Sequence, residues 1–326
     1  MLAGLGAVAL GPMVGCAAPM GAAEVRPETP RSPPRAPAAP VETNAPPAAR
    51  APEAAIPSEE AAAAPGPAPA GAHRLALPDR KPNADTGSRF LERTASLHPA
   101  DFEDAAYDEV SSGNVPPFQR ALVGVRLQAS SKRGKAHTGV VYVLCDYLAV
   151  GSDEDFLRLP LTPRTAQRVA ALTGCVLPTP KLVDAIYRQA PAKLPPRFIE
   201  GGPTLENRWD YLTHNRDLEE QRTKRKLALG ALTAGDKKDI VITNRLMKKH
   251  GRVAIYGWQR EDGSVIQHLS TVHSRKYADY SHGVRLVSAL MTVDGEERRV
   301  EDVLRDRELC SLLSNEGPLQ IVAYPA

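Results

Sequence analysis

The segment Thr271–Val287 has the densest group of side chains in the sequence that can transfer protons or form hydrogen bonds, T-V-H-S-R-K-Y-A-D-Y-S-H-G-V-R-L-V. His273 and His282 are the candidate acid and base of a catalytic site, because histidine titrates near neutral pH without help from its surroundings. Asp279 would orient one imidazole, and Ser281 is a candidate nucleophile or hydrogen-bond partner. The pattern therefore predicts a site in this segment.

Two more side chains of the segment are candidates for binding. Arg285 would pair with a carboxylate such as the end of a peptide, since a guanidinium presents a planar fork of donors, and Tyr280 would line the same site. In one interpretation of the segment, His273, Asp279 and His282 converge on a divalent metal such as zinc. Three protein ligands would leave a fourth position for an activated water.

The same side chains also suit a structural role without catalysis. Polar groups at a buried turn often satisfy one another in a hydrogen-bonded network, and Arg285 would then pair with an acidic neighbour. Asp239 and His214 could join the site in either interpretation. The network would consist of Tyr277, Asp279, Tyr280, Ser281 and His282.

The end of the segment resembles a known catalytic signature. Ser281–Leu286, S-H-G-V-R-L, is similar to the S-H-G-C-[IV]-R-[LM] motif of L,D-transpeptidases, which crosslink peptidoglycan through an acyl-cysteine. Val253–Gly257 and Asp302–Ala323 resemble the neighbouring parts of that family. Val284 stands where the family has two residues, the cysteine included, and Tyr256 replaces the family's upstream histidine. The resemblance thus implies a wall-acting protein whose site lacks the thiolate nucleophile.

The N-terminus resembles an export signal. Met1–Gly15 is an apolar run of the length of a signal-peptide core and is too short to span a bilayer as a helix. It leads into Met13–Cys16, M-V-G-C, which resembles the lipobox of bacterial lipoproteins. The resemblance implies that residues 1–16 are a signal peptide with lipidation at Cys16, and Ala17 implies the outer membrane of a Gram-negative cell. An uncleaved apolar anchor and an ordinary secretory signal are the alternatives.

Residues 17–86 differ in composition from the rest of the chain. Sixteen of the 30 prolines lie between Pro19 and Pro82, in a background of mostly alanine. Such a stretch cannot bury enough apolar surface to offset its ordering entropy, so we expect a disordered tether. An extended Pro/Ala arm would carry residues 87–326, the single expected globular domain, from a membrane toward the wall.

The expected fold class of residues 87–326 is α+β, with helices mostly in the first half and a mixed or antiparallel sheet mostly in the second half. Thr162-Pro163 and Thr179-Pro180 each place a capping threonine before a proline at the first helical position. They predict helices that continue to Leu172 and Ala190, respectively.

Several strands are expected from alternating or β-branched runs. Thr138–Val150 predicts a central strand with a bend at Asp146. Glu261–Ser264 and Asp294-Gly295 predict hairpin turns, and Leu319–Ala323 predicts a last strand.

Charge and cysteine content narrow the function classes. The net charge is +3, with 41 Lys+Arg against 38 Asp+Glu, so we expect no nucleic-acid partner. Cys145, Cys175 and Cys310 match no zinc spacing. An exported protein could pair two of them in a disulfide, Cys145 and Cys175 being the nearer pair in sequence.

Together these features predict a lipid-anchored protein of the outer membrane or periplasm, which acts on or binds peptidoglycan or another envelope polymer. A wall hydrolase or transpeptidase-like enzyme is one interpretation, and a non-catalytic binding or structural module is the other. Asp146–Asp153, D-Y-L-A-V-G-S-D, is also similar to a segment of a family of uncharacterised secreted bacterial proteins.

Overall fold

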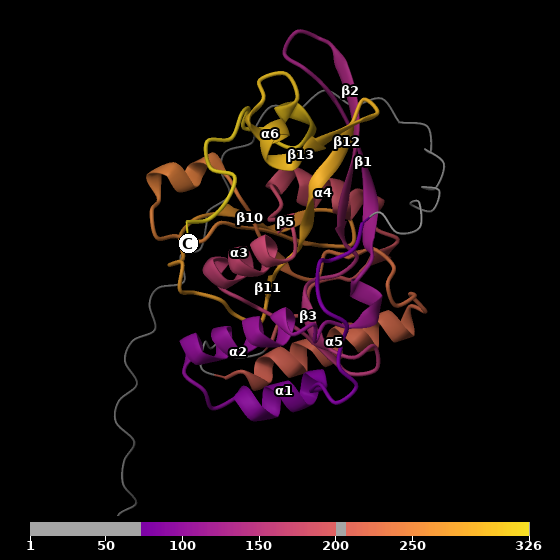
Figure 1. Ribbon diagram of the computed structural model, residues 1–326, viewed down its shortest axis with the longest axis vertical. Helices are drawn as coiled ribbons and strands as arrows, with labels where there is room; N and C mark the ends of the chain where they lie inside the picture. Colours follow the sequence, from indigo (N-terminus) through magenta and orange to yellow (C-terminus); the bar gives the residue numbers. More distant parts are fainter. Residues whose placement is uncertain (1–72, 200–206, 326) are drawn as a thin grey trace, which may run out of the picture. The chain divides into compact units, whose positions relative to one another are not determined.

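The structure is a computed structural model that describes residues 73–199 and 207–325. These residues belong to one compact unit. Helices and sheets follow one another without a regular strand-helix alternation, so the predicted α+β class is confirmed (Figure 1). In the two described ranges no helix has the length and apolar character needed to cross a bilayer. The predicted signal peptide and Cys16 lie outside the described residues.

The larger sheet joins strands from the two ends of the domain. The predicted central strand forms β2, which pairs antiparallel with a strand on each side. A fifth, short strand extends the sheet from β12. The order is β1 (Leu122–Ser130), β2 (Ala136–Leu144), β12 (Val287–Val293) and β13 (Glu296–Arg299), with β5 (Cys175–Val176) on β12.

The second sheet is mixed and is formed in the second half of the chain. Its order is β10 (Val265–Ser270), β9 (Ile255–Gln259), β8 (Lys238–Ile240) and β11 (His282–Gly283). The pair β8 and β11 is parallel, whereas the other neighbours are antiparallel. Two short ladders complete the strands, β3 (Ala149–Gly151) with β4 (Phe156–Arg158), and β6 (Ala192–Lys193) with β7 (Thr233–Ala234).

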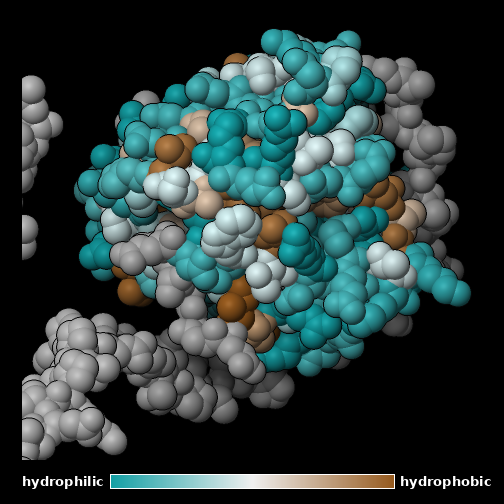
Figure 2. Space-filling model, turned by 90° about the horizontal axis from the view of Figure 1, so that it is seen from below, coloured by the Kyte–Doolittle hydropathy of each residue, from teal (hydrophilic) through white to brown (hydrophobic). Residues whose placement is uncertain are grey.

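Three helices gather at one end of the molecule (Figure 1). Phe102 joins them, since its ring centroid lies 5.6 Å from that of Phe90 and 5.9 Å from that of Tyr211. Seen from this end, the described surface is mostly hydrophilic with small apolar patches (Figure 2). The three helices at this end are α1 (Gly87–Thr94), α2 (Pro99–Ser111) and α5 (Trp209–Lys224). The other α-helices of the described residues are α3 (Pro163–Leu172), α4 (Pro180–Gln189) and α6 (Val300–Arg305).

The two helices predicted from Thr-Pro pairs are confirmed as α3 and α4. The hydroxyl of Thr179 accepts a hydrogen bond from the amide of Leu182 at 3.2 Å, which is the expected N-cap. Thr162 does not cap in this way, because its hydroxyl donates to the carboxylate of Glu103 at 3.0 Å. Glu103 thus ties the start of α3 to α2.

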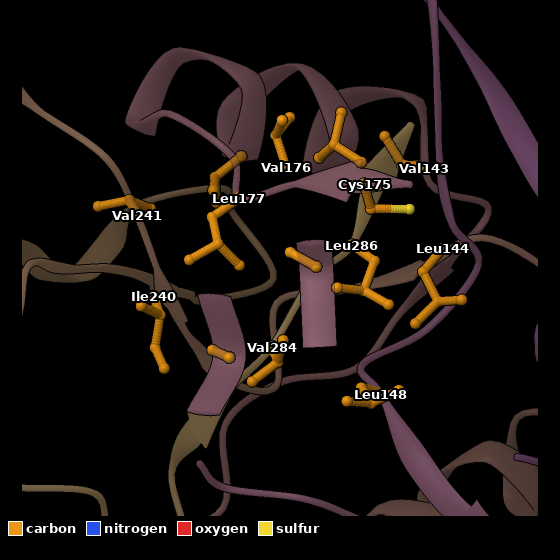
Figure 3. Close-up of a cluster of buried hydrophobic side chains, with 14 of the residues drawn as sticks. Val143, Leu144, Leu148, Cys175, Val176, Leu177, Ile240, Val241, Val284 and Leu286 are labelled. Carbon is orange, nitrogen blue, oxygen red and sulfur yellow. The ribbon is translucent and has the colours of Figure 1, made fainter. Parts of the chain in front are cut away.

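The apolar core surrounds the end of the segment Thr271–Val287. Val284 and Leu286 point into it, among side chains from β2, β5 and the stretch around Ile240 (Figure 3). The carbonyls of Val284 and Leu286 accept hydrogen bonds from the amides of Leu148 and Leu144, at 2.9 and 2.8 Å. The chain bends between Leu144 and Leu148, as predicted for Asp146, and this bend holds the segment against the core.

The expected strand at Leu319–Ala323 is wrong. This stretch forms no strand, although the amide of Leu319 donates to the carbonyl of Leu304 at 2.8 Å. Its anchor is the following Tyr324, whose hydroxyl donates to the carbonyl of Val241 at 2.8 Å. Side-chain burial, instead of a backbone ladder, fixes this C-terminal stretch.

Residues 73–86, which composition assigned to the tether, contact the domain. Leu75 is 5% exposed, and its amide donates to the carbonyl of Arg120 at 3.0 Å. The guanidinium of Arg80 donates to the side chain of Asn114 at 2.9 Å. The folded body therefore includes these residues, while residues 17–72 of the predicted tether lie outside the described part of the chain.

No disulfide joins the described cysteines. Cys145, Cys175 and Cys310 are all buried free thiols, so the considered pairing of Cys145 with Cys175 is not formed. Burial raises the pKa of Cys145 to about 12 and that of Cys175 to about 11, and it also raises the pKa of Cys310. None of these three thiols is an activated nucleophile.

Candidate functional site

The segment Thr271–Val287 runs from the surface into the core. Val272 is 67% exposed, whereas Val284 is fully buried. In between, His282-Gly283 forms β11 beside β8, and the amide of Lys238 donates to the carbonyl of Ser281 at 2.7 Å. The polar residues of the segment therefore lie at the transition from surface to core.

Asp279 is the centre of a compact hydrogen-bonded turn. One carboxylate oxygen accepts hydrogen bonds from both the amide and the hydroxyl of Ser281, at 2.8 and 2.5 Å. The other accepts from the hydroxyl of Tyr277 at 2.7 Å. Burial opposes ionisation, but charge on His282 and Lys238 and the hydrogen bonds from Ser281 and Tyr277 outweigh it and lower the pKa of Asp279 to about 2. Asp279 is thus a buried, ionised acceptor.

His282 is completely buried, with an exposed fraction of 0%. Neither of its ring nitrogens has a hydrogen-bond partner among the described residues. Its ring meets the ring of Tyr277 edge-on, with centroids 5.5 Å apart. Burial lowers the pKa of His282 to about 4, against the pull of Asp279, so the imidazole is neutral at pH 7.

His273 lies on the other side of Tyr277 and is partly exposed. The two rings are stacked, with centroids 4.3 Å apart and an interplanar angle of 11°. Burial and the nearby Lys238 lower the pKa of His273. The structure thus brings His273, Asp279 and His282 together around one tyrosine, but of these three only His273 has appreciable exposed surface.

The three-ligand metal arrangement considered from the sequence is not formed. Among residues 73–199 and 207–325, no group of three or more histidine, cysteine or acidic side chains is placed to hold a metal ion. Both oxygens of Asp279 are directed to Ser281 and Tyr277 instead.

The two predicted binding residues are also buried and occupied by the protein itself. Arg285 donates to the backbone carbonyls of Leu144 and Thr233, at 2.9 and 2.7 Å, and its guanidinium lies 4.1 Å from the ring centroid of Tyr147. The hydroxyl of Tyr280 accepts a hydrogen bond from the amide of Ile199 at 3.0 Å. Arg285 therefore ties the segment to two other parts of the chain and presents no open face to a ligand.

Three residues of the segment belong to a larger group of buried ionisable side chains, which we call the buried polar cluster. It combines three cations, four carboxylates and two histidines, each no more than 2% exposed. Its members come from four separate regions of the sequence, so only the fold brings them together. They are Asp146, Arg158, His214, Asp236, Lys237, Asp239, Asp279, His282 and Arg285.

Lys237, like Arg285, has no carboxylate bound to it by a direct hydrogen bond among the described residues. Its ammonium donates to the carbonyl of Tyr280 at 2.6 Å and lies 3.1 Å from Nδ1 of His214. Burial lowers the pKa of Lys237 and raises that of the adjacent Asp236, whose carboxylate oxygens have no partner in the described ranges. Burial likewise raises the pKa of Asp239 to about 7.

Arg158 forms the most extensive ion pair of the cluster. Two of its nitrogens donate to the two carboxylate oxygens of Asp146, at 3.0 and 2.7 Å. It also donates to Glu219 at 2.7 Å and to Asn215 at 3.0 Å. Every nitrogen of this guanidinium is therefore used to join the 146–158 region to α5 or to stabilise that region itself.

Arg158, Asp236 and Lys237 were not predicted as members of this site, and Asp146 was predicted only as a bend. Asp236 and Lys237 belong to the run D-K-K-D, which reads as a solvated turn. Arg158 carried a usable signal, because a single arginine within the apolar run F-L-R-L-P-L predicts a buried, paired cation.

Two positions at which the chain departs from the L,D-transpeptidase pattern are held by contacts within the protein. Val284 is packed in the apolar core, and the hydroxyl of Tyr256 donates to the carboxylate of Asp184 at 2.9 Å. Comparison of the chain with protein-family models, with curated proteins and with solved structures found no match to any of them.

Proposed function

We propose that this protein is a lipid-anchored component of the cell envelope whose folded body binds an envelope polymer at the peptidoglycan layer without cleaving it. The observation that carries the non-catalytic part is the burial of Ser281 and His282. Neither side chain exceeds 1% exposure, so a polymeric substrate has no route to them in this conformation.

The hydrogen bonds of the segment support the same proposal. A general base must reach the proton that it removes, directly or through one water. Both carboxylate oxygens of Asp279 instead accept hydrogen bonds from Ser281 and Tyr277, and Arg285 donates to backbone carbonyls. These contacts stabilise a turn and its attachment to the core, which is a structural role.

The envelope location is proposed from the N-terminal sequence. Met13–Cys16 resembles a lipobox, and the Pro/Ala-rich residues 17–72 provide a spacer between Cys16 and the folded body. Labelling of cells with radioactive palmitate should mark the wild-type protein, and Cys16→Ser should remove the label. A labelled Cys16→Ser protein, or an unlabelled wild type, would contradict the proposed anchor.

The binding proposal is tested with the purified full chain and isolated peptidoglycan. We expect the protein to sediment with the insoluble wall material while the supernatant gains no soluble fragments. If the wild-type protein stays in the supernatant at all protein concentrations, the proposed binding is wrong.

A wall-acting enzyme is the second candidate, and one observation favours it. His273 is partly exposed and stacks on Tyr277, whose hydroxyl donates to the ionised Asp279. A partly exposed imidazole can exchange a proton with a substrate, and the charge of Asp279 acts on it electrostatically. Release of wall fragments by wild type, and its loss in His273→Ala with unchanged sedimentation, would select the enzyme over the binding module.

A further inference from the structure

A pocket of about 450 Å³ lies away from the buried polar cluster. Its walls come from the start of α3, the turn that follows the 3₁₀ helix Asn244–Lys248, the end of α6 and the C-terminal stretch. Leu246, Val322 and Tyr324 give it an apolar base.

The charged residues of this pocket are all basic. The lining contains four arginines and one lysine, together with His250, and no aspartate or glutamate. Elsewhere on the surface cations are often paired, as Arg168 is with Asp104 at 2.9 Å. None of the pocket's five cations forms an ion pair with a described residue. They are Arg164, Lys249, Arg252, Arg275 and Arg305.

Backbone hydrogen bonds hold two of the arginines in place. The amide of Arg275 donates to the carbonyl of Gly251 at 2.8 Å, and Arg252 pairs with Ser274 in a β-bridge. The guanidinium of Arg252 donates to the carbonyl of Val272 at 2.6 Å. Gly251 has a φ of +77°, a conformation that favours glycine and lets the chain turn between Lys249 and Arg252.

Collecting like charges around one pocket is unfavourable unless an anion offsets them. Arginine guanidinium groups donate in pairs to phosphate or carboxylate oxygens. A phosphate monoester carries between about −1.5 and −2 charges and three acceptor oxygens, whereas a carboxylate carries one charge and two oxygens. Five cations around so small a volume therefore match phosphate better.

We propose that this pocket binds a phosphate-bearing ligand, with the phosphate groups held by Arg252, Arg275 and Arg305 and an organic part resting on the apolar base. The ligand is either a free organic phosphate or the headgroup of a phospholipid, which share this chemistry. Phosphate binding in this pocket does not depend on the proposed function. That proposal rests on the burial of Ser281 and His282, and neither residue lines the pocket.

The test is titration calorimetry of the full chain with inorganic pyrophosphate, short-chain dihexanoyl phosphatidic acid and citrate. We expect saturable pyrophosphate binding that weakens as salt is added, since screening reduces attraction between exposed charges. Tighter binding of phosphatidic acid than of pyrophosphate would identify a lipid headgroup as the ligand, and the reverse order a free phosphate. Citrate should bind at least about tenfold more weakly than the preferred phosphate compound, because each of its carboxylates carries one charge and two acceptor oxygens, against up to about two charges and three oxygens for a terminal phosphate.

The decisive variants change two charges inside or outside the pocket. Arg275→Gln/Arg305→Gln should weaken pyrophosphate binding by about 100-fold, because each lost charge-assisted hydrogen bond costs about tenfold. Lys276→Gln/Arg307→Gln removes the same charge from neighbouring positions outside the lining and should change binding less than about twofold. Equal urea midpoints of the two variants would establish that both are folded.

Three results would overturn the proposal. They are the absence of saturable binding by either phosphate compound, equal weakening in the two double variants, and binding of citrate as tight as that of the preferred phosphate compound. Failure of the protein to sediment with peptidoglycan would leave the titration unaffected, so the two proposals fail separately.

Discussion

The buried end of the segment Thr271–Val287 can be tested through the titration of His282. Its ring is completely buried and neither nitrogen has a partner among the described residues. Burial lowers its pKa from the usual 6.5 to about 4. Between these two pH values the unfolded chain binds a proton on His282 that the folded chain does not, so the free energy of unfolding falls as the pH falls.

The size of this effect follows from the shift. About 2.5 pKa units at 1.36 kcal/mol each correspond to about 3 kcal/mol of stability lost between pH 7 and pH 4. Replacing His282 by phenylalanine removes the titrating group and keeps a ring against Tyr277. At pH 7 we expect the variant to lie within about 1 kcal/mol of wild type, because the substitution removes two unsatisfied buried nitrogens and nearly conserves volume.

Urea denaturation followed by tryptophan fluorescence at pH 7, 6, 5 and 4 gives the difference in unfolding free energy between His282→Phe and wild type. This difference should grow by about 3 kcal/mol in favour of the variant as the pH falls to 4. His268 is exposed on β10, so His268→Phe should follow wild type at each pH. A His282→Phe difference that changes by less than about 1 kcal/mol over this range would refute the buried, neutral imidazole.

Four other substitutions, in the buried polar cluster and in the adjoining strand β11, are tested by urea denaturation. Arg158→Met should destabilise the fold by about 3–5 kcal/mol, because it leaves the buried carboxylate of Asp146 without its cation. Adding Asp146→Asn should recover part of that loss, and strict additivity of the two changes would contradict the pairing. Burial lowers the pKa of Lys237, so the unfolded chain retains this proton to higher pH and wild-type stability should rise from pH 7 to 9. Lys237→Met should lack this rise, and an unchanged slope would refute the assignment. Gly283→Ala should cost at least about 2 kcal/mol, since the added Cβ would lie 2.4 Å from Cδ1 of Tyr147, and a stability equal to wild type would show that the contact yields.

Local sequence patterns were sufficient to predict several elements. The starts of α3 and α4 were predictable because a threonine followed by proline carries its signal within two residues. The bend at Asp146 was predictable for a similar reason, since one carboxylate interrupts a β-branched run. The strand predicted at Leu319–Ala323 failed because a ladder needs a partner edge, which no local pattern specifies.

The candidate site shows the same limit more strongly. The hydrogen-bonded network considered from the sequence is formed in part, because Asp279, Ser281 and Tyr277 are neighbours in the chain. The other two expected members do not join it, since the hydroxyl of Tyr280 bonds to Ile199 and the ring nitrogens of His282 have no partner among the described residues. The sequence could not predict that Lys237 lies beside His214, since these residues belong to different elements. Residue type alone also gave no information on burial. In this segment, burial is what distinguishes a side chain that can act as an acid or base from one that only packs.

The buried polar cluster and the basic pocket represent two different uses of charge in one domain. Buried ion pairs contribute little net stability, because desolvation offsets their attraction, but a misplaced partner is costly. Arg158 therefore acts mainly by disfavouring other arrangements of the chain around Asp146 and α5. Arg275, at the exposed start of this segment, has no such partner among the described residues, so its charge remains available to a ligand. The segment that looks catalytic by composition thus fixes the fold at its buried end, and at its exposed end it supplies Arg275 to the proposed phosphate pocket.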